Sequence, residues 1–119
     1  MTYAPFLNQV NTIILANINN ESFCQEDLSQ ALYLSSSQVY RKIKQQSGMT
    51  PSVYIRNKRL EKAYKLIMRT DLYLYEITSF VGFGSLSYFS KCFSEYYGYP
   101  PSSLRRDFQK QMPLHIPSI

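Results

Sequence analysis

Apolar side chains recur every three or four residues along most of the chain, which is the spacing of helices that bury one face. The first such segment carries Phe6, Val10, Ile13, Ile14 and Ile18. No segment alternates between apolar and polar residues as a half-buried strand does. The pattern predicts an all-α protein with about seven helices, over residues 5–18, 25–33, 36–46, 51–69, 74–81, 86–97 and from 101 to about 108, followed by a tail at 109–119.

Residues with capping chemistry stand at the ends of two of these helices. Ser35 and Ser85 precede them, where a serine hydroxyl accepts a backbone N–H of the first turn. Gly48 and Gly98 follow them, where a chain that leaves a helix often turns left-handed. We therefore interpret the two serines first as helix caps, with a phosphate contact as a second role.

Aromatic residues must fill much of the protein's interior, because the chain has no tryptophan. Those expected in two small cores are Phe23, Phe80, Phe83, Phe89, Phe93, Tyr64 and Tyr96. The apolar face of the 51–69 helix is predicted to comprise Val53, Leu60, Ala63, Tyr64, Ile67 and Met68. On the same helix, Arg56 or Arg59 is expected to form ion pairs with Glu61, Glu76 or Asp107.

The two halves of the chain repeat each other. At an offset of fifty residues, six positions between 35 and 56 are identical in the second copy: Ser35, Ser37, Gly48, Pro51, Ser52 and Arg56. Just upstream the better offset is forty-nine, which pairs Asp27 with Glu76 and Leu34 with Phe83. Each copy is thus predicted to be a short helix, a turn and a second helix, with one extra residue in the second turn.

The second copy carries a specific motif, EITSFVGFGSLSYFSKCF at 76–93, followed by YGYPPS at 97–102. The first copy has a weaker version, SSSQVYRKIK at 35–44, followed by GMTP at 48–51. Together they resemble the DNA-binding domain of the AraC/XylS family of bacterial transcription regulators, whose signature is I-A-x-x-V-G-F, then S-Y-F-x-R/K-x-F, then G-x-x-P. The resemblance covers residues 6–108, almost the whole chain.

The resemblance implies two helix-turn-helix subdomains, at residues 1–50 and 70–108, joined by a linker helix at 51–69. It further implies sequence-specific binding of double-stranded DNA, regulation of transcription in the bacterial cytoplasm, and contact with RNA polymerase. Family members commonly carry this part behind a sensory or phospho-receiver domain. We therefore expect the chain to be the output domain of a larger regulator; a small stand-alone member is the alternative.

Helical geometry sorts the side chains of the two predicted recognition helices. Val39 and Ile43 lie four residues apart and are expected to face the core, as are Phe89 and Phe93 in the second copy. On the opposite side of the first helix lie Ser37, Tyr40, Arg41 and Lys44. The resemblance implies that these residues contact DNA, with Ser37, Tyr40 and Arg41 facing the bases. It implies the same groove-facing role for Leu86, Ser87, Tyr88 and Lys91 in the second copy. The alternative to DNA contact is a solvated helix face for Arg41 and Lys91. For Tyr40 and Tyr88 the alternative is partial burial between helices.

Two departures from the family pattern concern the turn and its packing. The family usually has glycine where this chain has Tyr33, and a bulky side chain is awkward in a left-handed turn. Thr78 stands where the family has alanine, and Ser29 where it often does. Both are small enough to keep the packing.

The distribution of charge agrees with an anionic partner. Thirteen basic against eight acidic residues give a net charge of +5. Residues 36–69 hold nine of the basic groups and only one acidic residue, Glu61. Such a segment is typical of a surface that faces phosphates.

Composition argues against several other functions. Cys24, Cys92 and His115 are too few and too scattered for a metal site or a catalytic pair, so we expect no metal, no cofactor and no enzymatic activity. No apolar run is long enough to span a membrane. The main alternative is a helical protein-interaction module with an incidental basic surface; RNA binding and a small enzyme are weaker candidates. Salt-dependent binding to duplex DNA distinguishes them.

The predicted linker suits two adjacent grooves. Nineteen helical residues span about 28 Å, and major grooves on one face of B-DNA recur about every 34 Å.

Overall fold

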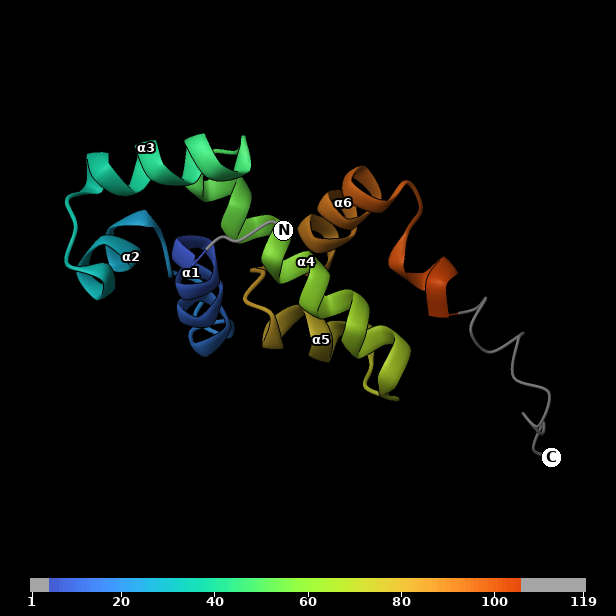
Figure 1. Cartoon of the computed structure of the whole chain (residues 1–119). Helices are drawn as coiled ribbons and strands as arrows, with labels where there is room; N and C mark the ends of the chain where they lie inside the picture. Colours follow the sequence, from blue (N-terminus) through green and yellow to red (C-terminus); the bar gives the residue numbers. More distant parts are fainter. Residues whose placement is uncertain (1–4, 106–119) are drawn as a thin grey trace, which may run out of the picture. The chain divides into compact units, whose positions relative to one another are not determined.

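The computed structural model describes residues 5–105, and all regular structure in that range is helical (Figure 1). The helices are α1 (Pro5–Ala16), α2 (Gln25–Leu32), α3 (Ser36–Ser47), α4 (Pro51–Arg69), α5 (Leu74–Phe80) and α6 (Leu86–Tyr97). Residues 101–105 begin a further helix. Its predicted end at Phe108, the tail at 109–119 and His115 lie outside the described residues. The all-α prediction is confirmed for the described part.

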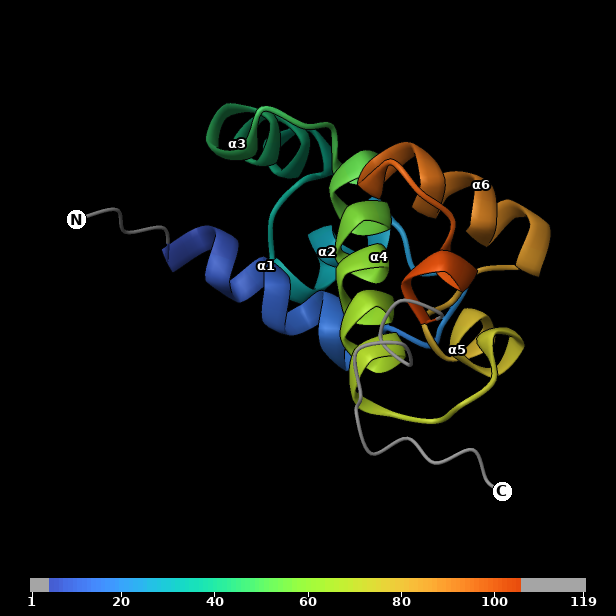
Figure 2. The same ribbon diagram turned by 90° about the vertical axis from the view of Figure 1, so that its right-hand side faces the viewer.

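The chain divides into two compact units, and the boundary falls between Arg59 and Leu60, inside α4. The first unit comprises α1, α2, α3 and the first half of α4. The second comprises the rest of α4 with α5 and α6. Figure 2 shows α4 as one uninterrupted helix, so each unit uses half of the predicted linker as part of its own structure.

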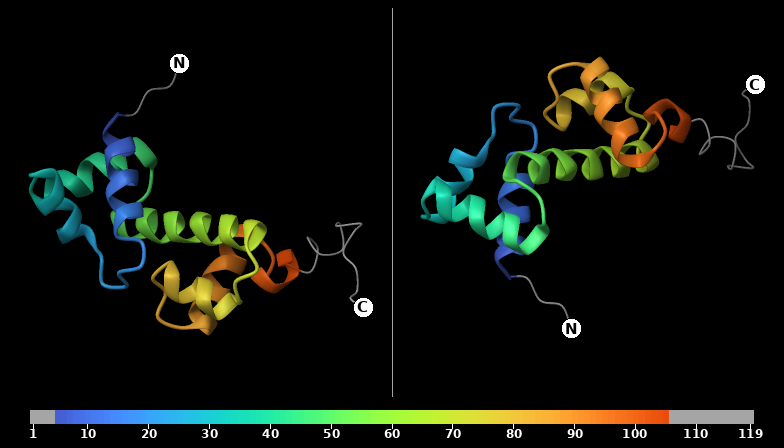
Figure 3. Two further views of the ribbon diagram at one scale, coloured as in Figure 1. Left: turned by 90° about the horizontal axis from the view of Figure 1, so that it is seen from below. Right: turned by 90° about the horizontal axis from the view of Figure 1, so that it is seen from above.

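The core of the first unit lies between α1, α2 and α3. α1 packs against both α2 and α3, which Figure 3 shows from two sides. Val10, Ile14, Leu28, Val39 and Ile43 contribute side chains that are at most 1% exposed. From α4 the unit also buries Tyr54 and Ile55, two residues outside the predicted apolar face.

The end of α1 differs from the prediction. The helix stops at Ala16, two residues early, and the chain continues in turns in which Ile18 donates its N–H to the carbonyl of Leu15. Ile18 is still buried. Its side chain continues the helical spacing of apolar residues although its backbone has left the helix, which is why the pattern placed the end too late.

Arg59 of α4 forms hydrogen bonds to the turn that follows α1. Its side chain is 5% exposed and donates to the carbonyl oxygens of Ile18 and Asn20, the latter at 2.9 Å. Burial lowers the pKa of the guanidinium, and Glu21 opposes that shift through its charge. Arg59 thus has a structural role through backbone carbonyl oxygens, whereas the ion pairs predicted with Glu61, Glu76 or Asp107 stay a prediction, and Asp107 lies outside the described residues.

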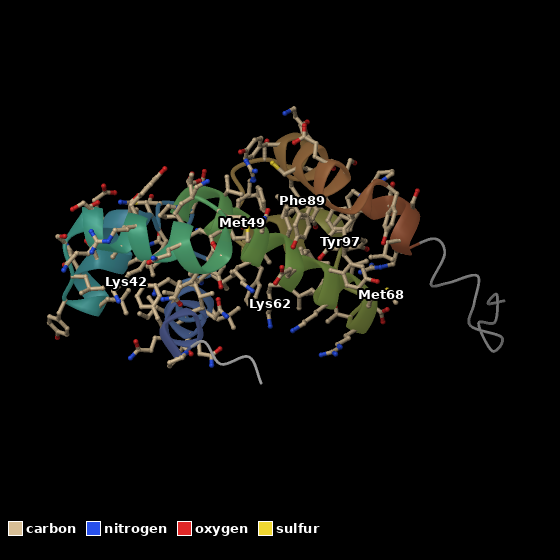
Figure 4. The ribbon with its side chains drawn as sticks, turned by 45° about the horizontal axis from the view of Figure 1, so that its top comes forward. Lys42, Met49, Lys62, Met68, Phe89 and Tyr97 are labelled. Carbon is tan, nitrogen blue, oxygen red and sulfur yellow. The ribbon has the colours of Figure 1, made fainter. Side chains whose placement is uncertain are left out.

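The second unit has an aromatic core between α4, α5 and α6. Along α6 the ring of Phe93 lies 5.6 Å from that of Phe89 and 4.6 Å from that of Tyr97. Tyr97 also lies 5.0 Å from Tyr64 of α4. Figure 4 shows Phe89 and Tyr97 on the side of α6 that faces α4. The fully buried aliphatic residues of this core are Leu60, Ala63, Ile67, Ile77 and Val81.

Two aromatic residues predicted for the core are exposed. Phe80 is 45% exposed because Ile77 and Val81 occupy the inward positions of this segment. Tyr96 is 41% exposed, and its hydroxyl donates to Glu61 at 2.7 Å. On α4, Val53, Tyr64 and Met68 are half-buried instead of buried.

Candidate nucleic-acid interface

The turns that join the two helices of each copy use the same hydrogen bonds. In both, two consecutive residues of the turn donate their backbone N–H groups to the last turn of the first helix; they follow α2 directly in the first copy and come after Val81 in the second. The bonds are Tyr33 to Gln30 (3.3 Å) and Leu34 to Ser29 (3.0 Å) in the first copy, and Gly82 to Ser79 (3.1 Å) and Phe83 to Thr78 (3.0 Å) in the second. These pairs lie forty-nine residues apart, and Gly84 then precedes Ser85. The extra residue predicted for the second turn is confirmed as Gly84.

Tyr33 keeps the left-handed conformation that its position requires. Its φ is 57° and its ψ is 38°, and the equivalent Gly82 has a φ of 84°. Among the described residues, Tyr33 alone combines a side chain with a positive φ. Such a conformation costs an L-residue about 1–2 kcal/mol. The ring is 94% exposed, so the first turn is strained without any packing gain from the tyrosine.

Ser29 and Thr78 fit their positions because their hydroxyls bond to the helix that carries them. The Ser29 hydroxyl donates to the carbonyl of Glu26 at 2.8 Å, and that of Thr78 to the carbonyl of Leu74 at 2.9 Å. Both side chains are buried. The expectation that the packing survives these two polar residues is therefore confirmed.

Serine caps hold the first turns of α3 and α6. The hydroxyl of Ser35 accepts the N–H of Gln38 at 3.2 Å, and the Gln38 side chain accepts the N–H of Ser35 at 2.9 Å. The hydroxyl of Ser85 accepts the N–H of Tyr88 at 3.1 Å. The capping role of both serines is confirmed, while a phosphate contact by either stays a prediction.

The exposed face of α3 carries all four side chains expected there. Val39 and Ile43 are 0% exposed and anchor the inner face. The exposed residues are Ser37, Tyr40, Arg41 and Lys44. Within residues 5–105, no carboxylate lies at ion-pair distance from Arg41. The guanidinium of Arg41 therefore has a full charge and five N–H donors to offer a ligand.

The other basic residues of α3 have contacts within the protein. Lys44 donates weakly to the carbonyl of Gly48, at 3.4 Å, near the end of the helix. The ammonium of Lys42, labelled in Figure 4, lies 5.2 Å from the ring centre of Phe6 in α1. Lys42 thus lies over Phe6 of α1 and is half-buried, whereas Arg41 and Lys44 are the cations on the exposed face of α3.

The exposed face of α6 is less basic. Phe89 and Phe93 are 0% exposed, and the four predicted contact residues are exposed: Leu86, Ser87, Tyr88 and Lys91. The ammonium of Lys91 lies 3.2 Å from a carboxylate oxygen of Glu95, one turn along the helix. Sequence reasoning overlooked Glu95, although its i,i+4 spacing from Lys91 was a usable signal.

Other site chemistry is limited in the part of the chain that the structure describes. No three His, Cys, Asp or Glu side chains gather there as metal ligands. None of its helices combines the length and hydropathy that a bilayer crossing requires. Cys24 is an exposed thiol whose pKa is raised, chiefly by its hydrogen bond to Glu26. A raised pKa disfavours the reactive thiolate.

Known proteins share both the sequence and this arrangement. A family model described as a helix-turn-helix domain matches residues 28–107. The HTH-type transcriptional regulator GbdR of Pseudomonas aeruginosa is 31% identical over 118 residues, which are 99% of this chain and 31% of GbdR. The chain spans about a third or less of the length of the first curated relatives it matches.

Solved structures agree with the fold. The C-terminal domain of the two-component response regulator yesN of Fusobacterium nucleatum is 32% identical, with a TM-score of 0.75 over 86% of this chain and 99% of that domain. The DNA-binding domain of AdpA, solved with a target DNA, has a TM-score of 0.80 at 22% identity, over 91% of this chain and 96% of AdpA's domain. The chain belongs to the AraC/XylS family of helix-turn-helix DNA-binding domains.

Proposed function

We propose that this domain binds a specific sequence of double-stranded DNA by inserting α3 and α6 into major grooves, and so regulates transcription. Base edges are contacted by Ser37, Tyr40 and Arg41 from α3 and by Leu86, Ser87 and Tyr88 from α6. Lys44 and Lys91 contact phosphates or guanine. Ser35 and Ser85, at the helix N-termini, position the backbone of the duplex.

The observation that carries this proposal is the separation of faces on α3. Its inner residues Val39 and Ile43 are fully buried, whereas the opposite side presents to solvent the guanidinium of Arg41, which has no carboxylate partner among residues 5–105. An exposed arginine on a helix that projects from a small core suits bidentate hydrogen bonding to guanine. The same division recurs on α6, where Phe89 and Phe93 are buried beneath the exposed Leu86 and Tyr88.

We further infer that the two recognition helices occupy successive major grooves on one face of the duplex. α4 has nineteen residues, and a helix of that length spans about 28 Å. Major grooves on one face of the duplex recur about every 34 Å. The length of the side chains and modest DNA bending can make up the difference between this spacing and the length of α4. The operator then contains two unlike half-sites about one turn apart.

The regulator that contains this domain is proposed to be longer than the chain. GbdR is about three times as long as the matched segment, and the yesN domain is the C-terminal part of a response regulator. Both relationships support an upstream sensory or receiver domain. The proposal includes action in the bacterial cytoplasm and contact with RNA polymerase, without an enzymatic reaction or a cofactor.

Titration of a labelled duplex at increasing salt concentration tests the proposal. Each phosphate contact contributes about −0.9 to the slope of log affinity against log salt concentration. We expect a steep linear decrease on both random and selected duplexes, with tighter binding to the selected one. A helical protein-interaction module with an incidental basic surface would show weak binding without sequence preference, and that result would refute the proposal.

A further inference from the structure

The two recognition helices carry different charges at matched positions. At the offset of fifty residues, Arg41 of α3 corresponds to Lys91 of α6, and Gln45 corresponds to Glu95. All four side chains are exposed. Lys91 forms its 3.2 Å ion pair with Glu95, whereas the residue four positions after Arg41 is the neutral Gln45. The same two helix positions therefore hold an ion pair in one copy and a cation with an amide in the other.

The difference extends over the whole of each helix. α3 has three basic residues and no acidic residue, whereas α6 has only Lys91 and Glu95 and is neutral. Ser94 of α6 stands where α3 has Lys44. The electrostatic part of the free energy of DNA binding increases with the number of phosphates that cations neutralise. We therefore expect α3 to contribute to this part and α6 to contribute little.

Glu95 has two effects on a duplex that approaches α6. Its carboxylate repels phosphates at short range, and its side chain is 61% exposed on the face that carries Lys91. It also attracts the Lys91 ammonium. An exposed ion pair of this kind is weak, so Lys91 can exchange Glu95 for a phosphate. The Glu95 carboxylate then still repels the phosphates.

We propose that Glu95 is a specificity-determining residue that keeps the second recognition helix electrostatically neutral. The first unit then supplies most of the phosphate-dependent affinity, and the second contributes through the hydroxyl and apolar groups of Leu86, Ser87 and Tyr88. Because such groups gain little from a mismatched duplex, the second unit binds only where the bases fit. This inference rests on the proposed function of the two helices.

The first variant to test is Glu95→Gln in the full chain, measured on a selected site and on a random duplex of equal length. Removal of the carboxylate frees Lys91 and gives α6 the same amide that α3 has at Gln45. We expect affinity for the random duplex to rise about threefold or more, and the slope against salt to steepen by up to about 1. Affinity for the selected site rises by no more than that for the random duplex.

The repeat supplies a reciprocal variant. Gln45→Glu places a carboxylate one turn from Arg41, in the arrangement that Lys91 and Glu95 now have. It is expected to lower the affinity for both duplexes at least threefold, roughly the effect of losing one phosphate contact. Asp71→Asn, between α4 and α5, changes the net charge by the same amount as Glu95→Gln at an exposed position outside both recognition helices. This control should bind DNA like the wild type.

The outcomes separate this inference from the proposed function. If the wild type fails to bind duplex DNA in a salt-dependent way, the proposed function is wrong and the inference with it. If the wild type binds as expected but Glu95→Gln matches it or matches Asp71→Asn, only the inference is wrong. A circular dichroism spectrum and melting curve equal to those of the wild type show that each variant is folded.

Discussion

Arg41 is the side chain on which base selection by the first unit most depends. It is exposed on α3 between the buried Val39 and Ile43, whose packing fixes the direction in which it projects. Its planar guanidinium matches the two acceptors that guanine presents in the major groove. A lysine in its place would offer a point charge without that fork.

Replacement of Arg41 by alanine is therefore expected to weaken binding to a selected site by about 1–3 kcal/mol and to relax base choice at one position. Affinities of wild type and variant for a panel of single-base substitutions measure both effects. Lys62→Ala, on α4, is the comparison and should change affinity little and uniformly. An equal loss on selected and random duplexes after Arg41→Ala would show that the residue contacts only phosphate.

Tyr33 offers a test of the strain in the first turn. Because its ring is 94% exposed, Tyr33→Gly removes almost no packing while it relieves the left-handed backbone at φ 57°. We expect the free energy of unfolding to rise by about 1 kcal/mol, after the greater chain entropy of glycine is subtracted. Chemical denaturation gives the number. A loss of stability in Tyr33→Gly would mean that the tyrosine makes a stabilising contact.

Among the helices, α4 stabilises the first unit through side-chain hydrogen bonds, in addition to the buried side chains of Tyr54 and Ile55. Tyr54 donates from its hydroxyl to the side chain of Asn11 in α1 at 2.6 Å, and Arg59 holds the carbonyls of Ile18 and Asn20. The first contact ties the middle of α1 to α4, and the second ties the turn after α1 to α4. This turn leads to α2, and α2 packs against α3. The position of the turn therefore affects how α3 is held.

Loss of the Arg59 contacts is expected to destabilise the first unit. Arg59→Met keeps most of the side-chain volume but leaves two carbonyl oxygens without this donor, which should cost about 2–4 kcal/mol of unfolding free energy. Thermal or urea denaturation measures the loss, and Lys65→Ala, at an exposed position on α4, is the control. A change below about 0.5 kcal/mol, the range of ordinary surface substitutions, would contradict a structural role for Arg59.

Elements whose signals are local were predictable from the sequence. The serine caps, Gly48 and Gly98 fixed the ends of α3 and α6, and the offset of forty-nine residues located the extra Gly84. Features that depend on tertiary contacts were not. Ile18 continues the apolar spacing outside its helix, and Phe80 is exposed because Ile77 and Val81 fill the inward positions. Neither fact can be derived from spacing alone.

The candidate site shows the same division. For the four candidates on α3, exposure followed from helix geometry, because they lie opposite the buried Val39 and Ile43; the four on α6 followed from the family resemblance, and they too are exposed. Their roles toward DNA stay predictions. The buried carbonyl contacts of Arg59 were not foreseen, since its partners are backbone atoms that carry no sequence signature. Glu95 was visible in the sequence but became informative only beside its counterpart, Gln45.

At the scale of the whole molecule, duplication gives one chain two unlike recognition helices. A protein that binds as a symmetric dimer presents the same helix twice and favours palindromic sites. Here α3 is strongly basic and α6 is neutral, so the two half-sites should differ in sequence and in their contribution to affinity. We therefore expect a directional operator with no two-fold symmetry.

Binding by two recognition helices of one chain is tested by selecting bound sites from random duplexes and footprinting the selected sequence. We expect two unlike sequence elements, protected in the major groove, with centres about 10–10.5 base pairs apart on one face of the duplex. Arg41→Ala should weaken protection at one element and relax its base preference at one position, and Ser87→Ala should weaken protection at the other. A single protected element, a palindrome, or the absence of any enriched sequence would contradict binding by two recognition helices of one chain.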